Sequence, residues 1–455
     1  MSDERSTAAR VPDPGVRALF RRDSRWQAWL DVEAALASAQ AELGIIPDSA
    51  AQAITQAARL ELLDRDRIAE AARRTSHTIV PLVWELSRVA GDAGGWVHWG
   101  ATTQNITQTG DLIVLRHAHR IFLRLIGHSL EAMAGLAERG AEMLMPGRTH
   151  GQHALPLTFG YKAAVWIDEM LRHLERLQQA EPRVFVAMFG GGAGTFASVG
   201  AEGSNPGPEI QARMAAHLGM RPMTVPARTI LDHLAEYVAL LGLLGATCGK
   251  IGREIYTLMK TEFGEVEEPL PPGTVGSSTM PQKRNPQLCQ DIIAAAAELR
   301  SLVPLAMEAA QTEHEADRTT TLMMHEALSR AAILTGDALV RLVNVLSDLK
   351  LDPARMRRNL DLSGGLIMAE AVMLKLAEAI GRQHAHDVVY EAAQEAATGK
   401  GSFAGLLAAD VRVTAHLAPE RIAALLDPTT YVGLCPKLAH QAAERARTAA
   451  ERLRA

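Results

Sequence analysis

The chain has 455 residues, of which 47% are hydrophobic, 22% charged and 4% aromatic, and its formal net charge is -5. This length allows roughly two to four domains, and the apolar share is large enough to bury a core without disulfides. The balance of 47 basic against 52 acidic residues leaves no excess of positive charge of the kind that nucleic-acid binding requires. We therefore expect no nucleic-acid partner.

The cysteines and the N-terminal segment bear on the cellular compartment. Cys248, Cys289 and Cys435 are far apart and form no C-x-x-C pattern, which is typical of a reducing compartment and disfavours a structural zinc site. Residues 1–15, MSDERSTAARVPDPG, are polar and lack the apolar segment of a signal peptide, and charges interrupt the longest apolar runs before membrane-spanning length. We expect a cytoplasmic protein with no membrane partner.

Hydrophobic periodicity is helical along almost the whole chain. In residues 25–43 apolar side chains recur at three- and four-residue steps, and Gly44 with Pro47 supplies a stop signal. The helical pattern continues from 110 to about 144, and two further stretches, 227–262 and the run between Pro304 and Pro353, contain no proline. Each could form a helix of roughly 50 Å, and helices of that length normally pack on one another or on copies in other subunits. The pattern predicts an all-α fold with a bundle of long helices in an oligomer.

Breaks rich in turn residues divide the helical pattern. They fall at 91–110, at the glycine-rich 182–226, at the Pro/Gly/Ser segment 265–286 and at 352–365, after which shorter helices follow. These breaks predict three helical domains: an N-terminal domain, 1–109, a central long-helix bundle, 110–358, and a C-terminal domain, 359–455.

Several patterns that suggest cofactors or metals fit poorly. The run GGGAG at 190–194 has its third glycine at the wrong step for a dinucleotide loop and lies in no βαβ pattern, so we interpret it as a tight turn between helices. The pairs His117/His119 and His384/His386 point to nearly opposite faces of a helix, which favours surface or interface histidines. No D-D-x-x-D, H-E-x-x-H or P-loop sequence occurs, so no metal and no cofactor are predicted.

Two segments concentrate groups that can do chemistry. Residues 148–153, RTHGQH, place two histidines beside a glycine in a break that precedes a helix, where a structural histidine is by itself the commoner interpretation. Residues 275–287, VGSSTMPQKRNPQ, combine two hydroxyls after a glycine with Lys283 and Asn285 on either side of Arg284. Donors and a cation gathered on one loop suit the stabilisation of an oxyanion derived from a carboxylate.

These segments resemble a known superfamily. Residues 276–286, GSSTMPQKRNP, resemble the signature GSSxMPxKxNP of the fumarase/aspartase superfamily, and 98–104, HWGATTQ, and 147–152, GRTHGQ, resemble the other two regions that build its site. The similarity extends along most of the chain. It implies a homotetramer with a 20-helix core, active sites shared by three subunits, and cofactor-free β-elimination that usually releases fumarate from a substituted succinate.

The resemblance also implies roles for individual residues. Ser277 would be the base that removes the Cβ proton and His150 the general acid, with His77 as an assisting histidine, and which of the two histidines is the acid stays open. Lys283 and Asn285 would hold a substrate carboxylate. The other expected substrate-binding residues are His98, Thr102, Thr103 and Gln104 in the first region, Arg148 and Thr149 in the second, and Ser278 and Met280 in the signature loop.

The chemistry of such an elimination is demanding. A proton next to a carboxylate is very weakly acidic, so the doubly charged aci-carboxylate intermediate needs fixed donors around it. Ser277 can act as a base only if Lys283, backbone N–H groups and the following helix N-terminus lower its pKa in a site closed to water. We therefore expect the loop to close as a lid, with hinges at Pro271–Gly273 and Gly276.

The sequence resembles two different branches of the superfamily. The stretches SRWQAWLDVEAALASAQAELGIIP, FGGGAGTFASVG and EHEADRTTTLMMHEAL resemble 3-carboxy-cis,cis-muconate cycloisomerases, whereas His150 with Gly151 resembles adenylosuccinate lyases. The serine- and arginine-containing stretch that holds a nucleotide phosphate in adenylosuccinate lyases has no match, and Asn105 stands where relatives usually carry Asp. We predict a carbon-nitrogen lyase that releases fumarate from a small 2-substituted succinate with an amine or nitro-type leaving group. The alternatives are a lactonising cycloisomerase, an adenylosuccinate lyase and a non-catalytic structural member of the fold.

Overall fold

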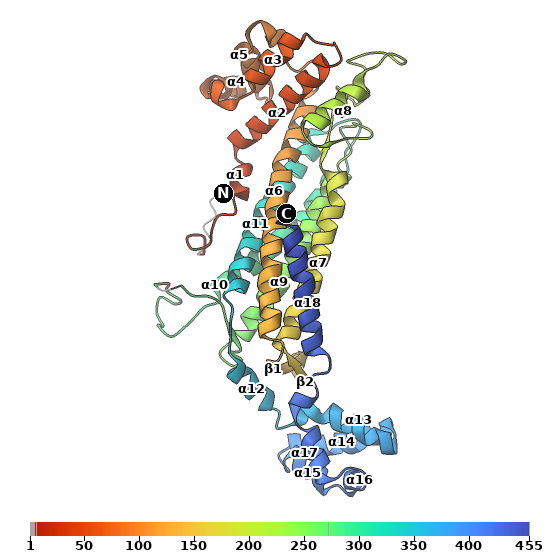
Figure 1. Cartoon of the computed structure of the whole chain (residues 1–455). Coiled ribbons are helices and arrows are strands. Elements are labelled where there is room, and N and C mark those ends of the chain that lie inside the picture. The colour runs from red at the N-terminus through yellow and green to blue at the C-terminus, as the bar shows by residue number, and fades with distance from the viewer. Residues whose placement is uncertain (1–4, 6, 272, 455) are drawn as a thin grey trace. The chain divides into compact units, whose positions relative to one another are not determined.

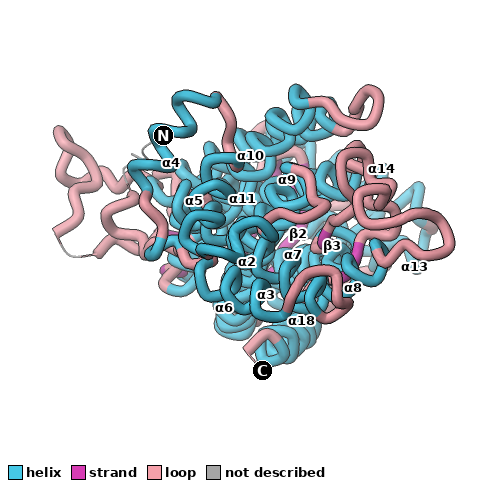
Figure 2. The backbone as a smooth tube through the Cα atoms, turned by 90° about the horizontal axis from the view of Figure 1, so that it is seen from above, coloured by secondary structure: helices cyan, strands magenta, loops and turns pink. Residues whose placement is uncertain are grey.

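The computed structural model describes residues 5, 7–271 and 273–454. Helices dominate the chain, and six short strands form three two-stranded sheets, β1–β2 and β5–β6 antiparallel and β3–β4 parallel. Figure 2 shows these strands as short pieces among helices. The predicted all-α class is confirmed.

The chain forms two compact units, each assembled from three stretches of sequence. Unit 1 comprises 1–125, 173–249 and 294–340, and unit 2 comprises 126–172, 250–293 and 341–455. The divisions fall within five long helices, namely α6 (Thr103–Arg139), α7 (Phe159–Val184), α9 (Asp232–Leu258), α10 (Gln287–Ala309) and α11 (Arg318–Ser347). The boundaries predicted after residues 109 and 358 lie inside α6 and α12, and the three-domain division stays a prediction.

Each of the remaining elements belongs to one unit, and many of them are labelled in Figure 1. Those of unit 1 are α1 (Val16–Leu19), α2 (Arg22–Ala41), α3 (Asp48–Ala57), η1 (Leu60–Leu62), α4 (Arg65–Thr75), α5 (Val80–Val89), η2 (Gly91–Trp96), β3 (Val186–Ala187), α8 (Gly207–His217) and β4 (Arg221–Pro222). Those of unit 2 are β1 (Leu144–Thr149), β2 (Gln152–Thr158), β5 (Val266–Glu267), β6 (Lys350–Leu351), α12 (Pro353–Asp361), η3 (Leu366–Met368), α13 (Ala369–Ile380), α14 (Arg382–Ala397), α15 (Phe403–Ala409), α16 (Val411–Thr414), α17 (Pro419–Leu425), η4 (Pro428–Thr430) and α18 (Cys435–Arg452).

The long helices differ from the sequence prediction at their ends. α6 begins at Thr103 rather than near 110, and the run between Pro304 and Pro353 is not one helix. α10 passes through Pro304 and ends at Ala309. α11 starts after a break in which Asp317 Oδ1 accepts a hydrogen bond from Thr319 N at 2.8 Å. This side-chain cap makes Asp317 a better helix start than a helix interior.

A row of glycines on α9 allows α10 to approach closely. In unit 1, a Cβ on Gly242 or Gly245 would lie 2.7 Å from the side chain of Val303 or Leu299 respectively. These glycines are three residues apart and share one face of the helix, so their missing side chains form a groove for α10. By length and composition α9 is long and apolar enough to cross a membrane, but 61% of its most apolar window is buried inside the protein. As predicted, charges interrupt its apolar run, at Glu236 and Lys250.

One histidine prediction is also wrong. His119 is not on the surface: it is 2% exposed in unit 1. Its Nδ1 lies 2.9 Å from the Tyr237 hydroxyl and its Nε2 lies 3.0 Å from Glu181 Oε1. Both ring nitrogens therefore have partners, which makes the burial of a polar ring tolerable.

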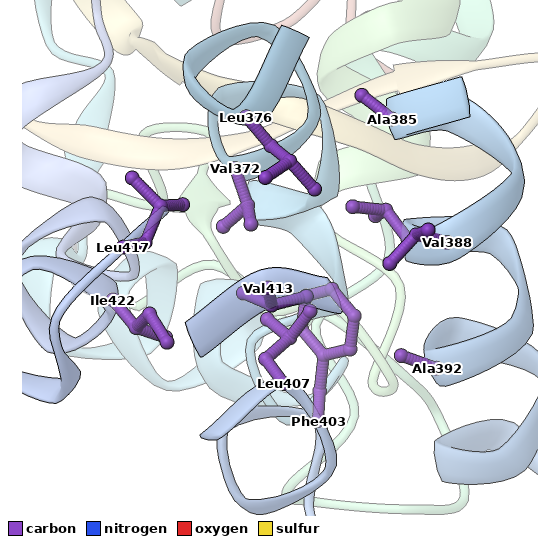
Figure 3. Close-up of a cluster of buried hydrophobic side chains, with 11 residues drawn as sticks. Val372, Leu376, Ala385, Val388, Ala392, Phe403, Leu407, Val413, Leu417 and Ile422 are labelled. Carbon is purple, nitrogen blue, oxygen red and sulfur yellow. The ribbon is translucent and has the colours of Figure 1, made fainter. Parts of the chain in front are cut away.

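The C-terminal helices of unit 2 surround a small apolar core of their own. Figure 3 shows side chains from α13 to α17 pointing toward one another. The buried members are Val372, Leu376, Ala385, Val388, Val389, Ala392, Phe403, Leu407, Val413, Leu417 and Ile422. Short helices joined by tight turns can bury apolar faces only against each other, which accounts for this separate cluster.

Candidate active site

A cavity of about 520 Å³ in unit 1 contains three of the predicted site residues, His77, Thr103 and Gln104. Its wall also includes basic and aromatic side chains that the motifs did not single out. The further lining residues are Arg25, Trp29, Ser76, Thr78, Thr107, Asp111, Arg228, Asp317, Arg318, Thr321, Leu322 and His325. The cavity thus joins the region before α5, the start of α6 and the start of α11.

The start of α6 is held by a buried amide. Asn105 is fully buried, and its Oδ1 accepts hydrogen bonds from the backbone N–H of Thr102 at 3.0 Å and of Gly191 at 3.2 Å. Gly191 has φ +75, a left-handed conformation that glycine adopts without strain. The glycine-rich loop therefore braces the first turn of α6, as expected for a tight turn rather than a nucleotide loop.

Gln104 is fixed by an arginine 124 positions away. Arg228 Nε donates to Gln104 Oε1 at 3.0 Å, and Gln104 Nε2 donates back to the Arg228 carbonyl at 2.8 Å. Arg228 Nη1 also donates to the Gly192 carbonyl at 3.0 Å. Burial lowers the pKa of Arg228 from its ordinary value, yet a guanidinium stays charged at neutral pH. Sequence reasoning missed Arg228, because it lies in a loop with no motif of its own.

His77 lines the cavity, and one of its ring nitrogens is bonded to the backbone. The residue before it, Ser76, has φ +51, and the backbone N–H of Val80 donates to His77 Nδ1 at 3.3 Å. Because Nδ1 accepts this bond, the neutral ring carries its proton on Nε2. A histidine in this tautomer can donate a proton or a hydrogen bond from Nε2.

His98 is directed elsewhere. It does not line the cavity, and its Nδ1 lies 2.6 Å from an oxygen of Glu33, a carboxylate 3% exposed on α2. Burial lowers the pKa of His98, but the hydrogen bond and the charge of Glu33 outweigh burial and raise it. With φ +63, His98 is also in the left-handed region. The contact anchors the segment that leads into Thr102, so we interpret His98 as holding the site rather than the substrate.

The second predicted region is a β-hairpin in unit 2, not simply a break before a helix. β1 and β2 pair from Leu144 with Thr158 to Thr149 with Gln152. The tip consists of His150 at φ +52 and Gly151 at φ +77. Thr149 and His150 are exposed there.

Arg148 secures the base of this hairpin. Its Nη1 and Nη2 donate to the two oxygens of the fully buried Glu265 at 3.0 and 2.7 Å. Asn359 Nδ2 donates to the same carboxylate at 2.8 Å, and the guanidinium lies 4.8 Å from the centre of the Phe263 ring. A guanidinium with a bidentate carboxylate partner is a structural anchor, so the structure gives Arg148 a role other than the predicted substrate binding.

The signature loop is also in unit 2 and folds around Ser277. The Ser277 Oγ accepts hydrogen bonds from the backbone N–H of Met280 at 3.1 Å and of Thr279 at 3.4 Å. Asn285 Nδ2 donates to the Gly276 carbonyl at 2.9 Å, which closes the loop on itself. Ser278, Met280 and Lys283 are exposed. Two N–H groups directed at one hydroxyl oxygen favour its ionised form.

The structure therefore brings the predicted residues together in groups. His77, Thr103 and Gln104 share the cavity of unit 1, where Thr102 lies one residue before its wall. In unit 2, Ser277, Ser278, Met280, Lys283 and Asn285 share the loop, and Thr149 and His150 share the hairpin tip. Within residues 5, 7–271 and 273–454, no hydrogen bond or ion pair joins that loop to that tip, and no group of three or more His, Cys, Asp or Glu side chains could hold a metal ion.

The sequence matches two family models and several known proteins. Residues 8–300 match the model described as "Lyase", and residues 365–442 match "Adenylosuccinate lyase C-terminus". The chain is 39% identical to an N-acetyl-S-(2-succino)cysteine lyase of Enterococcus italicus, over 92% of this chain and 91% of that protein. It is also 39% identical to a 3-carboxy-cis,cis-muconate cycloisomerase of Pseudomonas aeruginosa, with the same coverage, and 35% identical to an adenylosuccinate lyase of Methanocaldococcus jannaschii, over 94% and 93%.

Two solved structures share the fold. A fumarate lyase from Mesorhizobium sp. BNC1 aligns with a TM-score of 0.88 at 36% identity, covering 95% of this chain and 98% of that one. A 3-carboxy-cis,cis-muconate lactonizing enzyme from Pseudomonas putida aligns with a TM-score of 0.87 at 34% identity, covering 99% of both chains.

Proposed function

The chain belongs to the lyase family of the fumarase/aspartase superfamily, and from that premise we propose that it catalyses cofactor-free β-elimination from a small 2-substituted succinate, releasing fumarate. The observation that carries the proposal is the setting of Ser277. Its Oγ accepts hydrogen bonds from the backbone N–H groups of Thr279 and Met280, and the same loop carries Lys283. Donors directed at a hydroxyl oxygen stabilise its ionised form, which supports Ser277 as the base.

The proposed reaction has two steps. The Ser277 alkoxide takes a proton from C3 of the succinyl group, and the electron pair moves into the adjacent carboxylate to form the aci-carboxylate. Lys283 and Asn285 hold that carboxylate, while Thr102 and Thr103 hold the other and Gln104 supports them from the wall. The bond from C2 to the leaving atom then breaks, and His150 or His77 gives the leaving atom a proton. The products are fumarate and the protonated leaving group, so atoms and charge balance.

We propose that this site is completed in a homotetramer with a 20-helix core. The unit 1 cavity contains histidine and hydroxyl groups that can hydrogen-bond a substrate. The proposed base is on a loop of unit 2, and the proposed acid is on the tip of the unit 2 hairpin. The exposure of Lys283, Thr149 and His150 leaves those groups available to other copies of the chain. Three subunits would then supply the first region, the hairpin tip and the loop of each site. The predicted cytoplasmic location belongs to the same proposal.

The leaving atom divides the proposal into two versions. The sequence predicts nitrogen, so that the enzyme is a carbon-nitrogen lyase with an amine or nitro-type leaving group. The Enterococcus relative is named for a substrate in which the succinyl group is bonded to sulfur, which favours a thiol leaving group as the second version. Both versions use the same succinyl contacts and the same base.

A panel of 2-substituted succinates tests the proposal. The panel contains amino, alkylamino, nitro and alkylthio compounds, and the readout is the rise of the fumarate absorbance band. We expect one class to release fumarate and Ser277→Ala to abolish the release. Ser301→Ala on α10, an exposed serine whose Oγ donates to the Glu298 carbonyl, is the matched control and should keep full activity.

Three outcomes would contradict the proposal. If none of the panel yields fumarate while 3-carboxy-cis,cis-muconate loses its absorbance, the enzyme is a cycloisomerase. If adenylosuccinate alone is cleaved, the substrate is not small. A chain on which Ser277→Ala has no effect with any of these compounds would be a non-catalytic member of the fold.

A further inference from the structure

A small pocket in unit 1 adjoins the cavity that contains His77 and Thr103. Its volume is about 60 Å³, whereas that of the cavity is about 520 Å³. The residues that line both spaces are Arg25, Gln104, Thr107, Asp111, Thr321 and His325. Because the two spaces share this wall, the pocket is a side chamber of the candidate active site.

The pocket extends further along two helices than the cavity does. On α6 the cavity wall ends at Asp111 and the pocket wall continues to Leu115. On α11 the cavity wall ends at His325 and the pocket wall continues to Ser329. The lining residues of each helix recur at three- and four-residue steps, so one face of each helix lines both spaces. A ligand in the cavity can therefore extend by about one helical turn along α6 and α11.

Beyond the shared wall, the pocket is mostly apolar. Its apolar lining includes Leu112, Leu115, Leu231, Leu234, Met324 and Leu328. The first five of these side chains are at most 3% exposed. An apolar cavity of about 150 Å³ can bind benzene, so a pocket of about 60 Å³ has room for a short alkyl group rather than a ring.

The charged residues of the shared wall are paired with one another. Arg25 Nε and Nη2 donate to the two oxygens of Asp111 at 3.0 and 2.9 Å. Trp29 Nε1 donates to the same carboxylate at 3.2 Å, and His325 Nδ1 lies 3.5 Å from it. Burial raises the pKa of Asp111, but the hydrogen bonds and charges of His325 and Arg25 outweigh burial and lower it. Since these charges offset one another, a charged ligand group would enter the pocket at a high desolvation cost.

Gln108, which lines the pocket, has one amide group without a partner. Arg228 Nε donates to Gln104 Oε1, and Gln104 Nε2 donates to Gln108 Oε1 at 2.9 Å. Because a guanidinium can only donate, these bonds fix the orientation of both amides. Gln108 Nε2 is buried, and no described residue accepts a hydrogen bond from it. A buried donor without an acceptor is costly, so this N–H group favours a ligand that brings an acceptor.

We propose that the pocket binds a short, uncharged acyl chain on the leaving portion of the substrate. The alkyl end of this chain packs among the leucines of the pocket, and its carbonyl oxygen accepts a hydrogen bond from Gln108 Nε2. The succinyl end stays in the cavity beside Thr103 and Gln104. This inference rests on the proposed function and names the class of its leaving group. Gln108 is then a specificity-determining residue and takes no part in proton transfer.

Substrate pairs of matched chain length test the inference. In each pair one compound carries a plain alkyl chain and the other a ketone within the same chain, as in 2-(pentylthio)succinate and 2-(4-oxopentylthio)succinate, or the corresponding amines. Successive pairs move the ketone along the chain, and fumarate absorbance gives kcat/KM for each compound. We expect the ketone at one position to be preferred over the plain chain about 3- to 10-fold, the usual effect of one neutral hydrogen bond.

Variants of Gln108 locate the preference for the ketone. Gln108→Met retains much of the side-chain volume but removes the donor, so the preference should fall below about twofold. Gln108→Glu keeps an acceptor for Gln104 but brings an oxygen in place of the N–H group, so the plain chain should become the better substrate. Gln179→Met is the matched control, because Gln179 is an exposed glutamine on α7 that bonds to Glu175 outside the pocket. It should keep the native preference.

The length of the chain tests the apolar part of the pocket. Each methylene that the pocket buries should raise kcat/KM about fourfold until the pocket is full. Leu328→Ala enlarges the pocket and should shift the preference to a longer chain. Leu334→Ala also removes a buried leucine from α11, but outside the pocket, and should leave the preferred chain length unchanged. The comparison separates an effect on the pocket from a general loss of packing.

The outcomes distinguish the inference from the proposed function. The inference is wrong if native enzyme releases fumarate equally well from both members of every pair, or if Gln108→Met weakens both members alike. It is also wrong if Leu328→Ala and Leu334→Ala prefer the same chain length. In these cases the proposed function stands, because fumarate is still released. If no succinyl compound yields fumarate, the proposed function fails and the inference fails with it.

Discussion

The first turn of α6 in unit 1 and the loop 276–286 in unit 2 contrast sharply in how their side chains are held. Around α6, Asn105 is tied to the glycine-rich loop and Gln104 to Arg228 by hydrogen bonds across long stretches of sequence, and Thr102 donates to Asn105. The loop bonds mainly to itself, through Ser277 and Asn285, and leaves Lys283 exposed. The start of α6, the proposed binding region, is fixed by the fold, whereas the loop that carries the proposed base is exposed.

This contrast has a physical reason. A binding site for a dianion gains affinity from groups already fixed in place, because no ordering entropy is then lost on binding. A serine base gains reactivity only when water is excluded, which requires a segment that closes over the substrate. Variants in the two regions should therefore separate stability from activity.

The largest expected effect is that of Ser277→Ala. We expect fumarate release to fall by at least about 10³-fold, because an alanine cannot accept the proton that the proposed base removes. The free energy of unfolding should change by less than about 0.5 kcal/mol, since the loop is exposed. Steady-state rates and thermal unfolding of the same preparation measure both quantities. A loss of stability matching the loss of activity would show that the serine is structural.

The next effect should come from the base of the hairpin. Arg148→Met leaves the buried Glu265 with Asn359 as its remaining side-chain donor, and we expect a loss of about 3 kcal/mol in the free energy of unfolding. Arg172→Met removes an exposed pair with Asp168 and should cost less than about 0.5 kcal/mol. Denaturant titration compares the two. Equal, small losses would mean that Arg148 is free to bind substrate, as the sequence predicts.

A smaller effect is expected at the start of α6. Gln104→Ala removes the hydrogen bonds that fix Arg228 and one wall of the cavity, and KM for the succinyl substrate should rise about tenfold with little change in kcat. Gln179→Ala, on an exposed face of α7, is the control. An equal fall of kcat and rise of KM would place Gln104 in the chemical step instead.

The smallest effect concerns Glu33 and His98 and depends on pH. Glu33 raises the pKa of His98 above its ordinary value of 6.5, so the stability contributed by this pair is fully present below pH 6.5 and is lost as pH rises through the folded-state pKa. Glu33→Gln should therefore lower the melting temperature more at pH 5.5 than at pH 8.5. A difference that grows toward high pH would mean that His98 is neutral in the folded protein.

The sequence alone identified much of the candidate site by type. The helix predicted at 25–43 is α2, and the long helical runs are present with shifted ends. The structure adds partners that are distant in sequence: Arg148 lies 117 positions from Glu265, and His98 lies 65 from Glu33. The substrate-binding roles that the sequence implies for both residues stay predictions. No pattern of neighbouring residues in the sequence predicts a partner that is so far away along the chain. The α11 residues that line the cavity are Arg318, Thr321, Leu322 and His325. They recur at three- and four-residue steps, but this spacing does not predict which face of the helix meets the cavity.

What the sequence determined by itself are the properties set by near neighbours. Helical periodicity, the glycine row on α9 and the three motifs each depend on residues a few positions apart, so they can be recognised in the sequence alone. Only the tertiary structure determines which charged side chains are paired with groups of the protein and which are available to a ligand. In the sequence Arg25, Arg148 and Arg228 cannot be told from other arginines, and only folding brings Asp111, Glu265 and the Gly192 carbonyl to them.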